Sequence, residues 1–124
     1  TSMRKILYSP GYGTGWVSWG GDTAEQKRFM LEYAPFVEAL EDGAALRPVV
    51  RYSEADTKYN GQTDPVIRRF IDDWREKFGD APLPYFGGLR DLKVKTVDDG
   101  DVVRINEYDG SESVEVRGAF DGWL

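Results

Sequence analysis

The chain of 124 residues contains no cysteine and no histidine. Without cysteine it has no disulfide, no thiolate nucleophile and no iron–sulfur site, and its redox compartment stays open. Without histidine it has no Ser-His-Asp triad, no imidazole base and no common zinc or haem site. No apolar run is long enough to cross a membrane, and the first residues lack a signal-peptide pattern. These absences argue against most enzyme classes, and we predict a protein that is not an enzyme.

Charge narrows the class of partner. Asp and Glu number 22 against 16 Lys and Arg, a net charge of −6. A net acidic protein is poorly suited to bind DNA or RNA phosphates directly, but it suits a basic protein partner. We therefore predict no direct nucleic-acid binding. The lack of a long apolar run predicts no membrane association and an intracellular location. Homo-oligomerisation stays open.

Periodicity predicts where the helices lie. Asp22 and Thr23 form a cap before residues at helical spacing, and Pro35 predicts a kink or a break near Tyr33. A second helix begins after Asp64, with a proline at its first position, and ends at a glycine. Residues 46–52 could be extended, and residues 53–63 and 80–88 are expected to be loops.

Alternating apolar and charged residues predict three C-terminal strands, at 92–97, 102–108 and 114–117. Turn-forming Asp and Gly separate them, which predicts a three-stranded meander. A short apolar run at residues 4–8 predicts an N-terminal strand that joins it. The expected fold is α+β, with helices packed on one face of a small antiparallel sheet. A chain of this length is expected to form one compact domain. We place it at residues 3–124, because Thr1 and Ser2 look like a cloning remnant before Met3.

The stretch from residue 11 to residue 21 holds five glycines and three large aromatic residues, Tyr12, Trp16 and Trp19. Its G-x-G-x-G pattern lacks the Lys-Ser/Thr of a phosphate-binding loop, so it is a weak nucleotide motif. Two other interpretations stay open. The aromatic rings could fill the core beneath glycine turns, or they could form an exposed contact surface. The binding hypothesis requires these rings to be exposed.

Acidic residues cluster in the last predicted hairpin. A negative strip there could face a basic groove of a nucleic-acid-handling protein, and could mimic nucleic acid phosphates. Asp98, Asp99 and Asp101 surround a glycine, but their spacing is not that of a calcium loop, so a solvated turn is the preferred interpretation. No metal and no cofactor is predicted.

A small-ligand alternative rests on positive and aromatic residues in predicted loops. Arg51, Tyr52 and Arg90 could line a pocket for an anionic molecule such as a nucleotide, next to the glycine-rich stretch. Arg47, Lys58, Tyr59 and Tyr85 have similar positions. The sequence does not show that these residues converge.

Three segments of the chain, at 8–16, 85–94 and 104–115, read YSPGYGTGW, YFGGLRDLKV and RINEYDGSESVE. Together they resemble a group of small acidic proteins carried by bacteriophages and prophages. The resemblance spans nearly the whole chain. It implies a phage setting and a location in the host bacterial cytoplasm, but no reaction and no catalytic residue. Small phage proteins often bind host machinery, which suggests an anti-CRISPR-like or other anti-defence role by analogy.

The sequence therefore predicts a phage-associated protein that binds and inhibits a host factor such as a defence nuclease, with a small-molecule or nucleotide binder as the alternative. No catalytic residue and no metal ligand is predicted. The predicted binding residues are Tyr8, Tyr12, Trp16, Trp19, Arg51, Tyr52, Arg90, Glu107, Tyr108, Asp109, Glu112 and Glu115.

Overall fold

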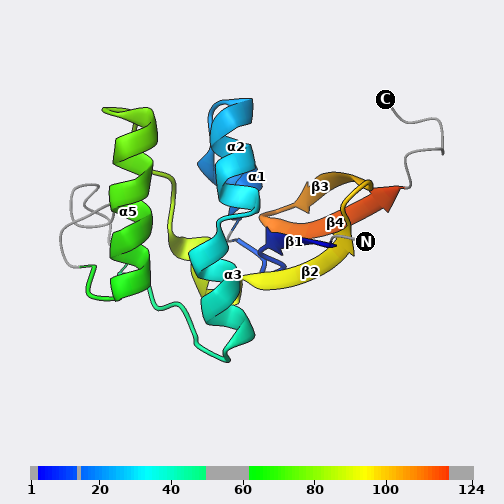
Figure 1. The fold of residues 1–124 in the computed structure, drawn as a ribbon, viewed down its shortest axis with the longest axis horizontal. Helices are drawn as coiled ribbons and strands as arrows, with labels where there is room; N and C mark the ends of the chain where they lie inside the picture. Colours follow the sequence, from blue (N-terminus) through cyan, green and yellow to red (C-terminus); the bar gives the residue numbers. More distant parts are fainter. Residues whose placement is uncertain (1–2, 14, 50–61, 118–124) are drawn as a thin grey trace.

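The computed structural model describes residues 3–13, 15–49 and 62–117. In chain order, its elements are β1 (Met3–Tyr8), α1 (Val17–Gly20), α2 (Ala24–Leu31), α3 (Ala34–Glu41), α5 (Pro65–Phe78), the 3-10 helix η1 (Gly87–Asp91), β2 (Lys93–Asp98), β3 (Val102–Tyr108) and β4 (Ser111–Arg117). The α+β class is confirmed. In Figure 1, α2 and α3 lie between α5 and the strands.

The strands form two antiparallel pairs, β1 with β2 and β3 with β4. The class is as expected, but the pairing of the predicted meander is wrong, because β2 pairs with the N-terminal strand and not with β3. Turn geometry explains the difference. Asp109 and Gly110 both have positive φ, 50° and 84°, as a tight two-residue hairpin turn requires. Gly100 does not share this conformation, so the chain leaves β2 without folding back along it.

The helices begin and end where the sequence indicated. Thr23 caps α2 in a capping box with Gln26, and the break at Pro35 separates α2 from α3. Asp64 caps α5 by accepting a hydrogen bond from the amide of Val66 at 2.9 Å, and Gly79 ends it with φ of 63°. The short α1, inside the glycine-rich stretch, and η1 were not predicted.

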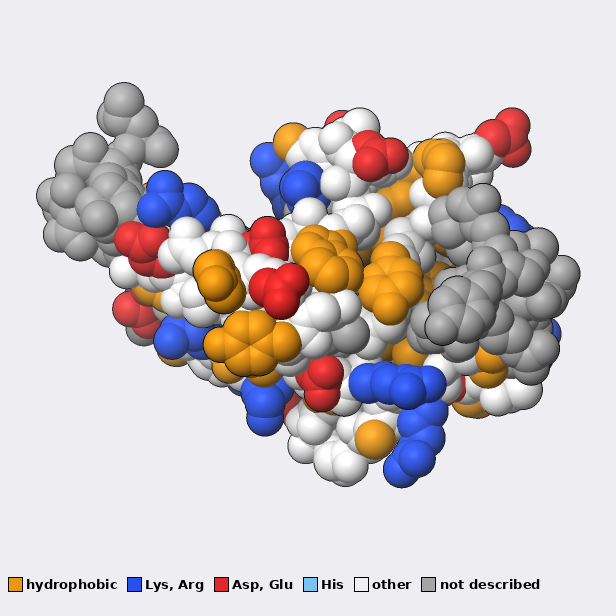
Figure 2. Space-filling view, turned by 180° about the vertical axis from the view of Figure 1, so that it is seen from behind, with side chains coloured by type: hydrophobic (Ala, Val, Ile, Leu, Met, Phe, Trp, Pro, Cys, Tyr) orange, Lys and Arg blue, Asp and Glu red, His pale blue; other side chains and the backbone are white. Residues whose placement is uncertain are grey.

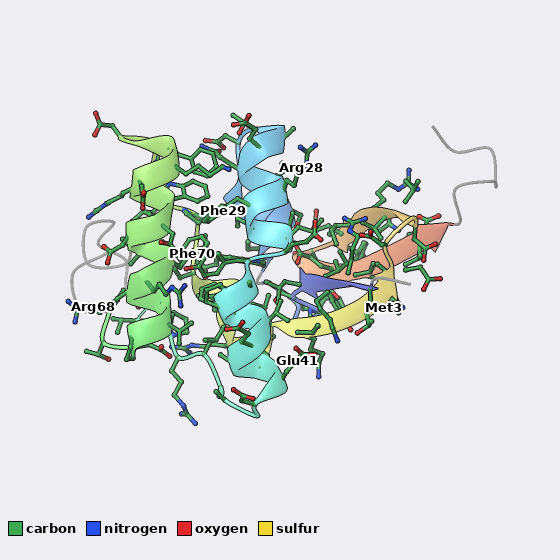
Figure 3. All side chains as sticks on the ribbon, viewed as in Figure 1. Met3, Arg28, Phe29, Glu41, Arg68 and Phe70 are labelled. Carbon is green, nitrogen blue, oxygen red and sulfur yellow. The ribbon has the colours of Figure 1, made fainter. Side chains whose placement is uncertain are left out.

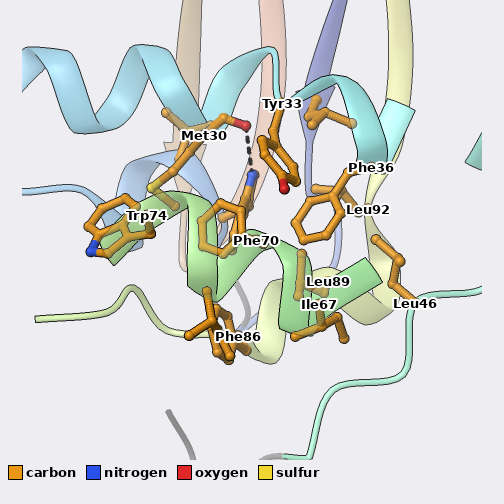
Figure 4. Close-up of a cluster of buried hydrophobic side chains, with 14 of the residues drawn as sticks. Met30, Tyr33, Phe36, Leu46, Ile67, Phe70, Trp74, Phe86, Leu89 and Leu92 are labelled. Atoms are coloured by element: carbon orange, nitrogen blue, oxygen red, sulfur yellow. Dashed lines mark hydrogen bonds between the residues drawn. The ribbon is translucent and has the colours of Figure 1, made fainter. Parts of the chain in front are cut away.

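An aromatic core joins the helices to the strands. Phe70 of α5 stacks on Phe36 of α3 at 5.2 Å between ring centroids, and Trp16 packs against both rings from the side of the glycine-rich stretch. Trp74 and Phe86 close the same cluster, and Figure 4 shows these residues around Phe70. The glycine-rich stretch is therefore fixed to the core through one of its own aromatic residues.

Candidate binding face

The glycine-rich stretch is organised around a buried carboxylate. Glu112, the second residue of β4, is only 2% exposed. One of its oxygens accepts from the amide of Ser9 at 2.8 Å. The other accepts from the amides of Trp16 and Ser18 at 3.1 and 2.7 Å and from the Ser18 hydroxyl at 2.6 Å. Four donors therefore converge on one carboxylate and tie Ser9, Trp16 and Ser18 to β4 by charge-assisted hydrogen bonds.

This arrangement bears directly on the phosphate-loop interpretation. A phosphate-binding loop points backbone amides at an anion supplied by the ligand. Here the amides of Trp16 and Ser18 point at Glu112, an anion of the chain itself. Those donors are already used, so the weak nucleotide motif gains no support from the loop geometry.

Backbone contacts join the same stretch to the tip of the β3–β4 hairpin. The amide of Gly13 donates to the carbonyl of Asp109 at 2.6 Å, and the amide of Glu112 donates to the carbonyl of Ser9 at 2.7 Å. The Ser111 hydroxyl donates to the carbonyl of Pro10 at 2.6 Å. The start of the chain and its last hairpin therefore form one surface, although about a hundred residues separate them in the sequence.

The two tryptophans of the stretch have opposite environments. Trp16 is fully buried, and its indole Nε1 donates to the carbonyl of Met30 at 3.0 Å (Figure 4). Trp19 is 44% exposed, and the centroid of its ring lies 6.1 Å from the centroid of the Tyr85 ring. The prediction that Trp16 contacts a partner is therefore wrong, because its ring is buried in the core. The two interpretations of the stretch each apply to different residues.

Glycine backbone supports the exposed pair of rings. A Cβ on Gly15 would lie 2.6 Å from the Trp19 ring, and one on Gly87 would clash with the Cζ and hydroxyl oxygen of Tyr85. A Cβ on Gly88 would lie 2.5 Å from the carbonyl oxygen of Gly15. The rings therefore pack on two glycine segments that touch each other, and larger residues at these positions would push them apart.

We define the aromatic face as Tyr12, Trp19, Tyr85 and Tyr108. Tyr12 and Tyr108 are 73% and 78% exposed and stand next to the two residues joined by the Gly13–Asp109 hydrogen bond. Tyr85 is 36% exposed. Figure 2 shows hydrophobic side chains close together on the rear of the molecule, with acidic side chains among them. Tyr85 was considered only for the small-ligand pocket and not for a protein contact surface, although its position in a Pro- and Gly-rich loop is a signal for exposure.

The acidic hairpin presents less charge than the sequence suggested. Glu112 faces inward, so its predicted contact with a partner is wrong, because the segment that covers it comes from the other end of the chain. Glu115 is half-buried and pairs with Arg104 at 2.9 Å. Glu107 and Asp109 are exposed at the tip, where Glu107 accepts from the amide of Gly110 at 2.7 Å. Two carboxylates therefore remain next to Tyr108.

The residues of the small-ligand alternative are only partly placed. Arg51 and Tyr52 lie outside the described residues. Arg90 is exposed on η1 and donates to the carbonyl of Pro48 at 3.5 Å. It lines a depression of about 300 Å³ together with Gly11 and Lys93. Tyr8 is half-buried and pairs with Lys93 across the β1–β2 ladder.

Side chains that could bind a metal ion do not gather in the described part of the chain. There, no cluster of three Asp or Glu side chains could hold a metal ion. The Asp101 carboxylate accepts from the amide of Asp98 at 3.2 Å and so closes the predicted turn.

Burial raises the pKa of the Tyr33 phenol, and its 2.6 Å hydrogen bond to Asp73 raises it further. Tyr33 therefore serves as a structural hydrogen-bond donor in the core.

Comparisons with known proteins give no family to which the chain can be assigned. It matches no protein-family model, no curated protein and no solved structure. Over residues 3–13, 15–49 and 62–117, no helix is both long and apolar enough to cross a membrane.

Proposed function

We propose that this protein acts by binding another protein through the aromatic face, and that it is not an enzyme. The observation that carries the proposal is the exposure of four aromatic side chains around a loop held by the buried carboxylate of Glu112. Tyr and Trp dominate binding hot spots because they bring large contact area with few rotatable bonds. A loop already fixed in the free protein loses little further entropy on binding.

Charge indicates the kind of partner. Glu107 and Asp109 are exposed and are the neighbours of Tyr108 in the sequence, and the whole chain carries a net charge of −6. Carboxylates beside aromatic rings suit arginine and lysine side chains, which stack on the rings and pair with the acids. The proposed partner is therefore a basic, nucleic-acid-handling protein of the host, such as a defence nuclease. The resemblance of three segments to phage proteins supports a phage setting and, with it, a proposed action in the bacterial cytoplasm.

Matched variants test this proposal. The tagged protein is used to capture partners from host lysate, in parallel with a double Tyr12→Ala/Tyr108→Ala variant and a Met3→Ala control. Met3 is also exposed, but it lies at the start of β1, outside the aromatic face. Support requires one defined protein that the wild type and Met3→Ala retain and the double variant loses, while all three unfold at the same temperature.

A charge variant separates the acidic contribution from the aromatic one. Neutralising the tip with Glu107→Gln and Asp109→Asn keeps hydrogen-bonding shape, and asparagine tolerates the positive φ at position 109. We expect a slower association with the captured partner and a weaker dependence of its rate on salt. Equal capture by the double tyrosine variant would refute the proposed contact surface.

A second candidate is small-anion binding at the depression lined by Gly11, Arg90 and Lys93, because this is where a cation of the predicted pocket meets the glycine-rich stretch. A thermal-shift panel of nucleotides tests it, with Arg90→Gln as the control variant. A melting temperature raised by one nucleotide in the wild type and unchanged in Arg90→Gln would favour it. A flat panel would rule it out.

A further inference from the structure

A groove of about 550 Å³ opens between α2 and β3, and none of its lining residues belongs to the aromatic face. Its α2 wall includes Lys27, Arg28 and Leu31, and its β3 wall includes Val102, Val103 and Ile105. The side chains of Val102 and Val103 point to opposite faces of the strand, because successive side chains alternate. Since both residues line the groove, it runs along the edge of β3.

This edge of β3 carries backbone groups that no neighbouring strand uses in the part of the chain that the structure describes. The two-residue turn makes Tyr108 and Ser111 the closing hydrogen-bonded pair of the hairpin. Hydrogen bonding to β4 then alternates along β3, so the N–H and C=O groups of Val103 and Ile105 point away from β4. Such an edge is a template for an added strand.

The opposite wall is positively charged in a chain that is acidic as a whole. Glu32 is bound by Arg4 through two contacts of 3.1 Å, and this hydrogen-bonded pairing raises the pKa of Arg4. Lys27 and Arg28 have no ion-pair partner within the described ranges. Figure 3 shows Arg28 on the side of α2 that faces the strands.

The remaining acid in the lining is Asp101, and its carboxylate accepts from the amide of Asp98 at 3.2 Å. Lys27 and Arg28 thus leave positive charge available beside the apolar side chains of the two walls, Leu31 of α2 and Ile105 of β3.

We propose that the groove takes an extended acidic segment of another protein, which adds to β3 as a strand. Main-chain hydrogen bonds form with Val103 and Ile105. On the face of the segment that is turned to α2, apolar side chains pack on Leu31 and Ile105 and alternate with carboxylates. The carboxylates of the segment pair with Lys27 and Arg28. This site is distinct from the aromatic face and does not depend on the function proposed there.

The probe is a short synthetic peptide of repeated Glu-Glu-Val-Val, which places both residue types on each face of an extended strand. It is titrated into the full-length, isotope-labelled protein and followed by the amide resonances of Val103 and Ile105. Two matched peptides serve as controls, one with Lys in place of Glu and one with alternate backbone nitrogens methylated. We expect at least about tenfold weaker binding of both controls, because one meets like charge and the other lacks main-chain donors. Equal binding of either control would overturn the proposal, and so would no binding of the probe.

Variants of the protein make the same test from the other side. Lys27→Glu/Arg28→Glu should lower affinity for the probe at least about tenfold, because two pairs become repulsive. The matched control Arg68→Glu/Lys95→Glu, which reverses two exposed cations outside the groove, should leave it unchanged. Equal losses in the two double variants would mean general charge attraction and would overturn the site.

Val103→Pro tests the strand edge alone, because it removes an amide that points away from β4. It should abolish probe binding with the fold retained by circular dichroism; if it unfolds, the methylated peptide decides the same point. Concentration-dependent dimers that Val103→Pro abolishes would mean that a second copy occupies the edge, against the proposal. Tyr12→Ala/Tyr108→Ala should leave probe binding unchanged, so this site and the aromatic face fail separately.

Discussion

Replacing Glu112 with glutamine tests whether the buried carboxylate holds the glycine-rich stretch. The two oxygens of Glu112 accept four hydrogen bonds, one from Ser9, one from Trp16 and two from Ser18. Glutamine has the same shape but only one acceptor oxygen. Whichever way its amide turns, the NH₂ group faces at least one buried N–H donor.

The expected loss follows from these contacts. In the better orientation the amide oxygen keeps the contacts with Trp16 and Ser18, and the NH₂ group faces the amide of Ser9. The unpaired Ser9 donor costs about 1–3 kcal/mol, and the retained hydrogen bonds lose the strength that a charged acceptor gives them. We expect the free energy of unfolding to fall by about 2–4 kcal/mol in total, a large part of the roughly 5–15 kcal/mol typical of a domain.

Urea unfolding followed by circular dichroism measures the free energy of unfolding, and hydrogen exchange at the amides of Ser9, Trp16 and Ser18 locates the effect. Glu115→Gln is the matched control, because Glu115 pairs with Arg104 at the surface and such pairs contribute at most about 1 kcal/mol. Ordinary surface substitutions change the free energy of unfolding by at most about 0.5 kcal/mol. If Glu112→Gln differs from the wild type by no more than that, the carboxylate does not hold the loop.

Three further changes test other parts of the structure. Gly88→Ala should lower the free energy of unfolding, measured with urea, by about 1–3 kcal/mol, because the added Cβ meets the backbone of Gly15. The control Gly100→Ala adds a Cβ in open space and should change it by less than about 0.5 kcal/mol. Equal effects would contradict the close packing at Gly88. The pKa of Tyr33 is raised in the folded protein, so above pH about 10 the phenol ionises in the unfolded chain before it does so in the folded one. The contribution of Tyr33 to the free energy of unfolding is therefore complete below pH about 10 and falls above it by up to about 1.4 kcal/mol per pH unit. In urea unfolding, the free energy of unfolding should fall less between pH about 9 and about 11 in Tyr33→Phe than in the wild type. An equal fall in both proteins would refute this. Asp64→Ala should cost about 1 kcal/mol in thermal unfolding through loss of the α5 cap, and no change would argue against that cap.

Local signals predicted the helices and the fold class. Cap residues, a proline inside a helical pattern and glycine after the last turn act within a few residues, so Thr23, Pro35 and Asp64 identify their elements without tertiary information. The tight turn at Asp109 and Gly110 is equally local and predicted the last hairpin. The partner of β2 was not predictable in this way, because strand pairing depends on contacts far apart in the chain.

For the candidate site, the sequence by itself determined which side chains are present: aromatic rings among glycines, an acidic hairpin, and no histidine or cysteine. Only the tertiary structure decided which of them are exposed. Trp16 and Trp19 stand three residues apart in the same stretch, yet one fills the core and the other reaches the surface. Glu112 belongs to the acidic hairpin that was predicted to face a partner, yet its carboxylate is buried under Ser9, Trp16 and Ser18. The amides of these three residues need an acceptor, and the hairpin brings it to them.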